Sequence, residues 1–181
     1  LVMMTNTLTI ALSFGGIALA FCYPFMKRHT HLPQVVLGAA FAWGIPMAFA
    51  AQNNAIDARS WLIYTTVVLW TVVYDTFYAM VDRDDDRLIG VKSTAILFGE
   101  GDRAITAVLQ VMVLIGLAMI AEQFSLGFYF DLSVLVVAGL FAWQQMLIKS
   151  RLRDNCFKAF LNNNWVGATV FVGIVLDKAL L

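Results

Sequence analysis

Residues 60–90 read SWLIYTTVVLWTVVYDTFYAMVDRDDDRLIG, and this stretch joins a long apolar segment to four aspartates within five positions. The segment from Ser60 to Val81 is long enough to cross a hydrocarbon core about 30 Å thick, which takes about 20 helical residues. One ionisable residue, Asp75, lies within it, about two turns from its end. A charge inside a span is costly and indicates a functional role. The stretch therefore predicts a membrane helix that ends in a charged site.

Uncharged segments of similar length occur elsewhere in the chain. The chain has 181 residues, of which 61% are hydrophobic and only 13% are charged, a composition outside the range of ordinary soluble domains. The five further apolar runs are Leu1–Met26, Leu32–Ile56, Ala104–Ala121, Leu132–Ile148 and Ala159–Leu176. We therefore expect an all-α, polytopic transmembrane bundle of six helices in the lipid bilayer, within one domain. The formal net charge is zero, so the charge of the whole chain says nothing about partners. We expect no nucleic acid partner.

The basic residues are distributed unevenly between the two sides of this predicted bundle. The loops at residues 23–33, 82–103 and 149–158 carry ten of the twelve, whereas the opposite side has Arg59 and Lys178. Cytoplasmic loops of membrane proteins are enriched in Lys and Arg. We therefore expect the basic loops and the aspartates to face the cytoplasm. The first span would then run inward, so we expect an odd number of helices upstream and interpret the chain as a C-terminal fragment.

The spacing of the aspartates predicts that three of them share one helix face. Asp75 and Asp82 are seven positions apart, close to two turns at about 3.6 residues per turn, and Asp86 follows four positions later. If the helix continues through the cluster, these three lie on one stripe beside Tyr78, and Asp84 points elsewhere. Like charges at this spacing repel unless a cation lies between them.

Carboxylates in this arrangement suit a hard divalent cation. Mg²⁺ usually takes one or two carboxylates and shares its remaining ligand positions with water and substrate phosphates. The pair Asp82 and Asp86 at a membrane surface therefore predicts a Mg²⁺-bridged phosphate site. The alternative is a solvated helix end whose charges serve solubility. An EF-hand is excluded, because its required glycine and final glutamate would be Arg87 and Ser93.

Three long motifs resemble one known family. Residues 74–99, YDTFYAMVDRDDDRLIGVKSTAILFG, resemble the second aspartate-rich motif of the UbiA-type intramembrane prenyltransferases. Residues 23–51, YPFMKRHTHLPQVVLGAAFAWGIPMAFAA, and residues 156–167, CFKAFLNNNWVG, resemble the same family. The likeness spans nearly the whole chain. It is greatest to members that prenylate 4-hydroxybenzoate in ubiquinone biosynthesis.

The resemblance implies a larger protein than the chain itself. Family members have nine transmembrane helices and two aspartate-rich motifs, and the first motif, Asn/Asp-x-x-x-Asp, is absent here. Residues 1–181 would then be helices four to nine of a single membrane domain, with half of the metal site. The resemblance further implies a bacterial inner-membrane location with the active site on the cytoplasmic side. We expect the fragment alone to be inactive.

The family's reaction supplies the expected mechanism. A polyprenyl diphosphate would lie with its tail between helices and its diphosphate on Mg²⁺ held by both motifs. The C–O bond breaks to leave an allylic cation, the ring carbon ortho to the hydroxyl of 4-hydroxybenzoate attacks it, and a proton is lost. Two alternatives remain open: a family member with another acceptor, such as homogentisate, dihydroxynaphthoate, haem or a lipid headgroup, and an ion-coupled transporter that binds its ion at Asp75.

The resemblance also assigns roles to the acidic residues. Asp82 and Asp86 match the metal-binding pair of the family, and Asp75 matches an acidic position just upstream with a supporting catalytic role in metal, water or proton handling. Tyr78 lies beside this stripe as a substrate-binding candidate. We expect Asn162–Asn164 to act mainly as capping and loop residues at the start of the last helix.

A second group of candidates comes from the basic loops. Tyr23 and Lys27 match the family's Tyr-x-x-x-Lys stretch, and with Arg28 they would face the site. We expect Arg28 to bind the carboxylate of 4-hydroxybenzoate, because its guanidinium suits bidentate contacts. Lys27 and Lys92 would bind the diphosphate. The alternative for Lys27 and Arg28 is a purely topogenic positive charge, and the alternative for Lys92 is solvation of its loop.

Overall fold

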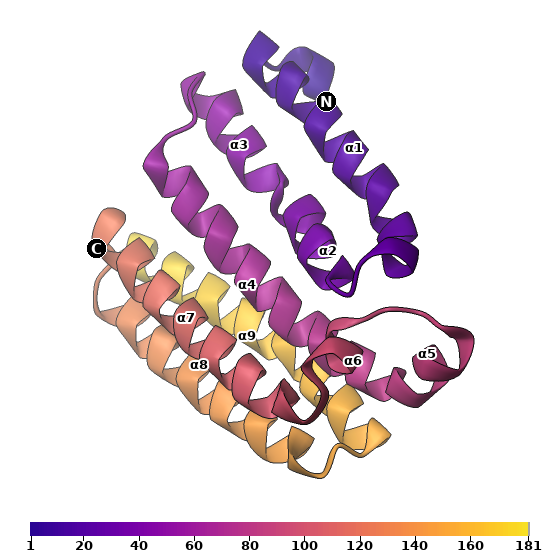
Figure 1. Ribbon diagram of the computed structural model, residues 1–181. Coiled ribbons are helices and arrows are strands. Elements are labelled where there is room, and N and C mark those ends of the chain that lie inside the picture. Colours follow the sequence, from indigo (N-terminus) through magenta and orange to yellow (C-terminus); the bar gives the residue numbers. More distant parts are fainter. Residues whose placement is uncertain (181) are drawn as a thin grey trace.

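The chain folds as a bundle of long helices. The computed structural model describes residues 1–180, and this part contains no β-strand (Figure 1). Six segments are long and apolar enough to cross a membrane, which confirms the predicted all-α, multi-pass membrane protein. They are α1 (Thr7–His29), α2 (Pro33–Ala42) with α3 (Gly44–Asn53), α4 (Ala58–Val81), α6 (Thr94–Phe98) with α7 (Asp102–Gln123), α8 (Phe128–Leu147) and α9 (Arg153–Leu180).

Helix α4 is the centre of the bundle. It packs against α2 on one side and against α7 and α9 on the other, whereas α1 packs on α2 and α3 (Figure 1). Val73 and Phe77 of α4 are fully buried. The α4–α7 contact depends on Gly116, because a Cβ there would lie 2.3 Å from Oγ1 of Thr66. Small residues at such crossings let membrane helices approach closely. The helix that carries Asp75 is therefore held on several sides.

The second span is broken, whereas the sequence predicted one continuous run. Helix α2 ends at Ala42, α3 begins at Gly44, and Trp43 lies between them. Pro46 lacks an N–H, so the carbonyl of Ala42 loses its usual helical partner there. The Trp43 indole donates a hydrogen bond to the Leu12 carbonyl at 2.8 Å, which fixes the bend against α1.

The loops are shorter than predicted, because helices extend into them. Helix α1 continues to His29, and α9 begins at Arg153. The prediction that Asn162–Asn164 cap the last helix was wrong, since they lie well inside α9. Asn163 is buried there and its side chain accepts a hydrogen bond from the indole of Trp70 at 2.8 Å. The Asn163 side chain therefore contacts a neighbouring helix instead of a helix end.

The three basic segments meet at one end of the bundle. The backbone N–H of Lys92 donates to the Lys27 carbonyl at 3.0 Å. Arg153 forms an ion pair with Asp85 at 2.9 Å. The end of α1, the short helix α5 (Arg83–Ile89) and the start of α9 are thereby neighbours. This grouping agrees with the charge pattern, and the side of the membrane on which it lies stays a prediction.

Candidate active site

A small charged cavity lies at this end of the bundle. Its volume is about 60 Å³, and α1, α2, α4, α5 and the segment before α6 all contribute to it. The residues that line it are Tyr23, Lys27, Gln34, Asp75, Tyr78, Ala79, Asp82, Asp86 and Ser93. The structure therefore brings together three aspartates and several hydrogen-bond donors from segments far apart in the sequence. We call this space the charged cavity.

The three aspartates reach the charged cavity across a junction between helices. Helix α4 ends at Val81, Asp82 occupies the junction, and α5 begins at Arg83, so the expected single helix is interrupted. The backbone N–H of Asp86 still donates to the Asp82 carbonyl at 2.8 Å, which keeps the one-turn relation between them. Asp84 does not line the cavity: its side chain is 75% exposed.

The charged cavity has an excess of negative charge. Burial raises the pKa of Asp86 above its ordinary value, Lys27 opposes this shift, and Asp82 and Asp85 add to it. Desolvation and neighbouring carboxylates both disfavour the charged form of a carboxyl group. A cation between Asp82 and Asp86 would favour that form. The site is therefore electrostatically suited to a positive ligand.

The carboxylates of the charged cavity can supply some of the ligands of a metal ion but not a full set. Within residues 1–180, no group of three or more His, Cys, Asp or Glu side chains is arranged to hold a metal ion. Asp82 and Asp86 nevertheless present hard oxygen ligands one turn apart, and Mg²⁺ commonly takes one or two carboxylates and completes its ligands with phosphates and water. The residues present suit a divalent cation that also binds other groups.

Two larger cavities with more apolar linings lie along α4 and α9. A cavity of about 270 Å³ between α4, α7 and α9 is lined almost entirely by apolar side chains, including Trp70. A second, also about 270 Å³, includes Trp70, Tyr74 and Phe160. Ring-to-ring contacts run from Trp70 through Tyr74 and Phe160 to Tyr78, with centroids 5.8, 6.1 and 5.3 Å apart. Because Tyr78 lines the charged cavity, aromatic surface connects it to apolar space.

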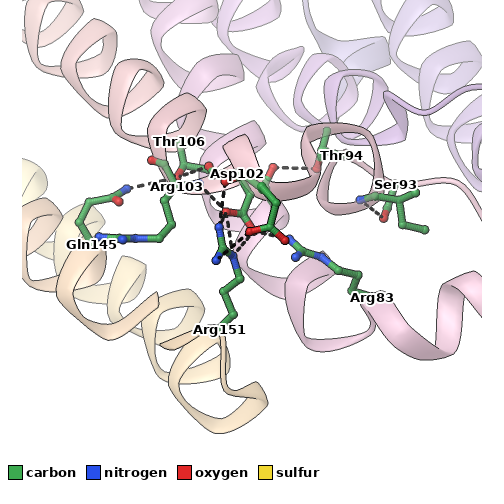
Figure 2. A network of polar contacts seen from close by, with 11 residues as sticks. Arg83, Ser93, Thr94, Asp102, Arg103, Thr106, Gln145 and Arg151 are labelled. Carbon is green, nitrogen blue, oxygen red and sulfur yellow. Dashed lines mark hydrogen bonds and ion pairs between the residues drawn. The ribbon is translucent and has the colours of Figure 1, made fainter. Parts of the chain in front are cut away.

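A buried ion-pair network holds the helix that bears Asp86. Asp102, the first residue of α7, is fully buried and accepts hydrogen bonds from Arg83 of α5 and from Arg151 before α9 (Figure 2). The Arg151 contacts measure 2.9 to 3.1 Å, and the backbone N–H of Arg103 donates to the same carboxylate at 2.6 Å. Arg83 directly follows Asp82. Asp102 therefore ties the junction to two other helices.

Comparison with known proteins shows the family to which the chain belongs. The sequence profile of the UbiA prenyltransferase family matches residues 1–168. The chain belongs to the UbiA prenyltransferase family. Two relatives named 4-hydroxybenzoate octaprenyltransferase are 66% identical over 180 residues (Saccharophagus degradans) and 64% identical over 177 residues (Hahella chejuensis). These alignments cover 99% and 98% of this chain but 60% and 59% of the relatives, so the chain spans about three fifths of their length.

Solved structures agree with the family assignment. The apo structure of a UbiA homolog from Aeropyrum pernix K1 superposes with a TM-score of 0.83 at 26% identity, over 98% of this chain and 66% of that one. A structure described as digeranylgeranylglyceryl phosphate synthase has a TM-score of 0.81 over 99% of this chain and 64% of the other. At 13% identity, the second shows the shared fold alone. Family membership disfavours the ion-coupled transporter that the sequence left open.

In this UbiA prenyltransferase chain, two predicted site residues lie outside the charged cavity. The side chain of Arg28 is exposed and does not line it. Lys92 also does not line it, and its ammonium group donates to the His29 carbonyl at 3.4 Å. Sequence reasoning missed Gln34 and Asp102, although each is a polar residue at the start of a long apolar run. A polar residue at that position is a signal from which both residues could have been predicted as candidates.

Proposed function

We propose that the protein containing this chain transfers a polyprenyl group from polyprenyl diphosphate to 4-hydroxybenzoate, ortho to the hydroxyl, in ubiquinone biosynthesis. The observation that carries the proposal is the charged cavity, which is connected to apolar space by the aromatic run that ends at Tyr78. A substrate with a diphosphate head and an isoprenoid tail needs both environments side by side. The names of relatives 57–66% identical to the chain support this reading.

Asp82 and Asp86 are proposed to bind Mg²⁺ together with ligands from the remainder of the protein. Bound Mg²⁺ supplies Lewis-acid neutralisation of the leaving diphosphate. Lys27 lines the same cavity and binds a diphosphate oxygen, and Asp75 handles a proton or water beside it. Residues 1–181 are then helices four to nine of a nine-helix domain that contains a second aspartate-rich motif.

The acceptor requires a different set of contacts. We assign the 4-hydroxybenzoate carboxylate to Arg28, whose planar guanidinium can donate two parallel hydrogen bonds. Arg28 follows Lys27 directly and is free to approach a ligand because its side chain is exposed. Tyr23 and Tyr78 contact substrate from the cavity wall, and Lys92 approaches the diphosphate from the loop before α6. The reaction takes place at the cytoplasmic side of the bacterial inner membrane, where the basic segments lie.

The test is a prenylation assay on the protein extended by the segment that its relatives possess beyond this chain. Purified protein in detergent is incubated with octaprenyl diphosphate and 4-hydroxybenzoate, with and without Mg²⁺. We expect ring-prenylated product only with Mg²⁺, and none from the 181-residue chain alone. Homogentisate and dihydroxynaphthoate are the competing acceptors. Product from either of these but not from 4-hydroxybenzoate would refute the assignment, and so would activity that chelation of divalent metal leaves intact.

A further inference from the structure

Gln34 is a buried amide in the wall of the charged cavity. It is the second residue of α2, its side chain is only 2% exposed, and it lines the same space as Asp75, Asp82 and Asp86. A glutamine side chain has one carbonyl oxygen that accepts and one NH₂ group that donates twice. Which of these ends faces the cavity decides what the residue can bind.

The contact with Thr94 fixes the orientation of this amide. The backbone N–H of Thr94 donates to Oε1 of Gln34 at 3.1 Å. An N–H requires an acceptor, so the oxygen faces Thr94 and the NH₂ group points away from it. Thr94 is itself held, since its hydroxyl lies 2.8 Å from the hydroxyl of Thr76 on α4. The side chain of Gln34 is therefore anchored at its oxygen end to two other elements.

Among the described residues, the nitrogen end of Gln34 has no hydrogen-bond acceptor. Across the described chain, no hydrogen bond is formed by Nε2. Nor is Nε2 among the fully enclosed side-chain atoms that lack a partner, which are Nε of Arg83, Nε of Arg103 and Oδ1 of Asp177. Because Gln34 is almost completely buried and lines the charged cavity, we infer that the small remaining surface of Nε2 faces that cavity. Two N–H donors are thus available to a ligand there.

We propose that Gln34 donates a hydrogen bond to a phosphate oxygen of the prenyl diphosphate, an assignment that rests on the proposed function. The carboxylates of the cavity repel an anion, so its oxygens need donors in addition to a metal ion. Lys27 and Ser93 line the same cavity and also carry side-chain donors, an ammonium group and a hydroxyl. The cavity is small, at about 60 Å³, and every residue that lines it except Ala79 has a polar side chain, which suits phosphate oxygens better than an aromatic ring.

The two ends of the Gln34 side chain have different roles, since the oxygen accepts from Thr94 and the nitrogen is proposed to donate to phosphate. Substitutions can test the two roles separately. Gln34→Glu keeps an oxygen for the Thr94 N–H but replaces the donor by a carboxylate oxygen. Gln34→Met removes donor and acceptor without adding charge. Gln52→Glu makes the same chemical change at an exposed position near the end of α3 and serves as the control for added charge.

The variants are compared in the full-length protein by Mg²⁺-dependent binding of inorganic pyrophosphate, by KM for each substrate and by thermal unfolding. We expect Gln34→Glu and Gln34→Met each to weaken pyrophosphate binding and raise KM for the prenyl diphosphate by roughly ten- to a hundredfold, the range of hydrogen bonds to charged groups. KM for 4-hydroxybenzoate should be unchanged. Both variants should unfold below the wild-type temperature: Gln34→Met because the Thr94 N–H loses its acceptor, and Gln34→Glu because it adds a buried carboxylate to a cavity that already has an excess of negative charge.

Specific outcomes would overturn the proposal. Wild-type pyrophosphate affinity in Gln34→Met would show that the donor is not used, even if Gln34→Glu binds poorly through charge repulsion. A rise in KM for 4-hydroxybenzoate alone would assign the amide to the acceptor instead. Failure of the wild-type protein to bind pyrophosphate with Mg²⁺ or to prenylate would refute the proposed function itself, and this result is distinguishable from a failure confined to the Gln34 variants.

Discussion

At the scale of single residues, close packing decides which small changes the bundle tolerates. Gly116 on α7 faces Thr66 of α4, and an added Cβ would lie 2.3 Å from Oγ1 and 2.9 Å from Cγ2 of that side chain. Gly139 on α8 has no heavy atom within 4 Å of the corresponding position. A glycine-to-alanine substitution would therefore add a methyl group to a filled contact at Gly116 and to open space at Gly139.

We predict that Gly116→Ala destabilises the protein and Gly139→Ala does not. Overpacking a well-filled contact typically costs about 1–3 kcal/mol, whereas alanine is favoured over glycine in an open helical position by roughly 0.5–1 kcal/mol. Thermal unfolding in detergent, followed by circular dichroism, measures both. Equal unfolding temperatures for the two variants would show that α4 and α7 are not packed as closely as described.

At the scale of elements, the position of α5 depends on the carboxylate of Asp102. This side chain is completely buried and pairs with Arg83 and Arg151, whereas the pair between Arg153 and Asp85 is more than half exposed on both sides. Removal of one partner from a buried ion pair leaves an uncompensated charge, but exposed pairs contribute little. The two contacts bind the same short helix with very different strength.

Asp102→Asn is predicted to destabilise the bundle by about 3 kcal/mol or more, because the nearly buried Arg83 would lose its counter-ion and Arg151 would keep only the exposed Glu100. Arg153→Ala should cost at most about 1 kcal/mol. Hydrogen exchange of residues 83–89 reports on the helix directly, with faster exchange expected for Asp102→Asn only. If both variants protect this segment as well as the wild type does, Asp102 does not hold α5.

Most elements, but not their interruptions, could be predicted from the sequence. Spans follow from apolar length, and the clustering of Asp75, Asp82 and Asp86 follows from helical spacing, which persists across the junction. The break at Trp43 combines a local cause, Pro46, with a hydrogen bond to Leu12, 31 residues away, which fixes the bend. The placement of Asn163 likewise depends on Trp70, 93 residues away. The local sequence pattern does not reveal such distant contacts. A polar residue in an apolar run is therefore interpreted as a cap or loop residue until its partner is known.

At the scale of the whole molecule, charge predicts the orientation in the membrane. Arg83, Arg151 and Arg153 lie at the same end as the charged cavity, and Asn54 lies in the turn between α3 and α4. Single cysteines at Asn54 and Leu152, in a background without the exposed Cys22, should be labelled from opposite sides of intact cells. We expect an impermeant reagent to label Asn54→Cys alone. Labelling of both from outside would contradict the assigned topology.

The aspartate cluster is proposed to hold a divalent cation against a diphosphate, and substitutions of Asp82 and Asp84 test this role most directly. Asp82 lines the charged cavity, whereas the Asp84 side chain is 75% exposed and outside it. The measurement is the prenylation rate of the full-length protein across a Mg²⁺ titration for Asp82→Asn, Asp84→Asn and wild type at matched expression. Loss of a ligand that stabilises transition-state charge should slow Asp82→Asn at least about a hundredfold, with only partial rescue by excess Mg²⁺. Asp84→Asn should stay within a few-fold of wild type. Equally mild effects of both substitutions would contradict the account and reduce the cluster to a solvated helix end.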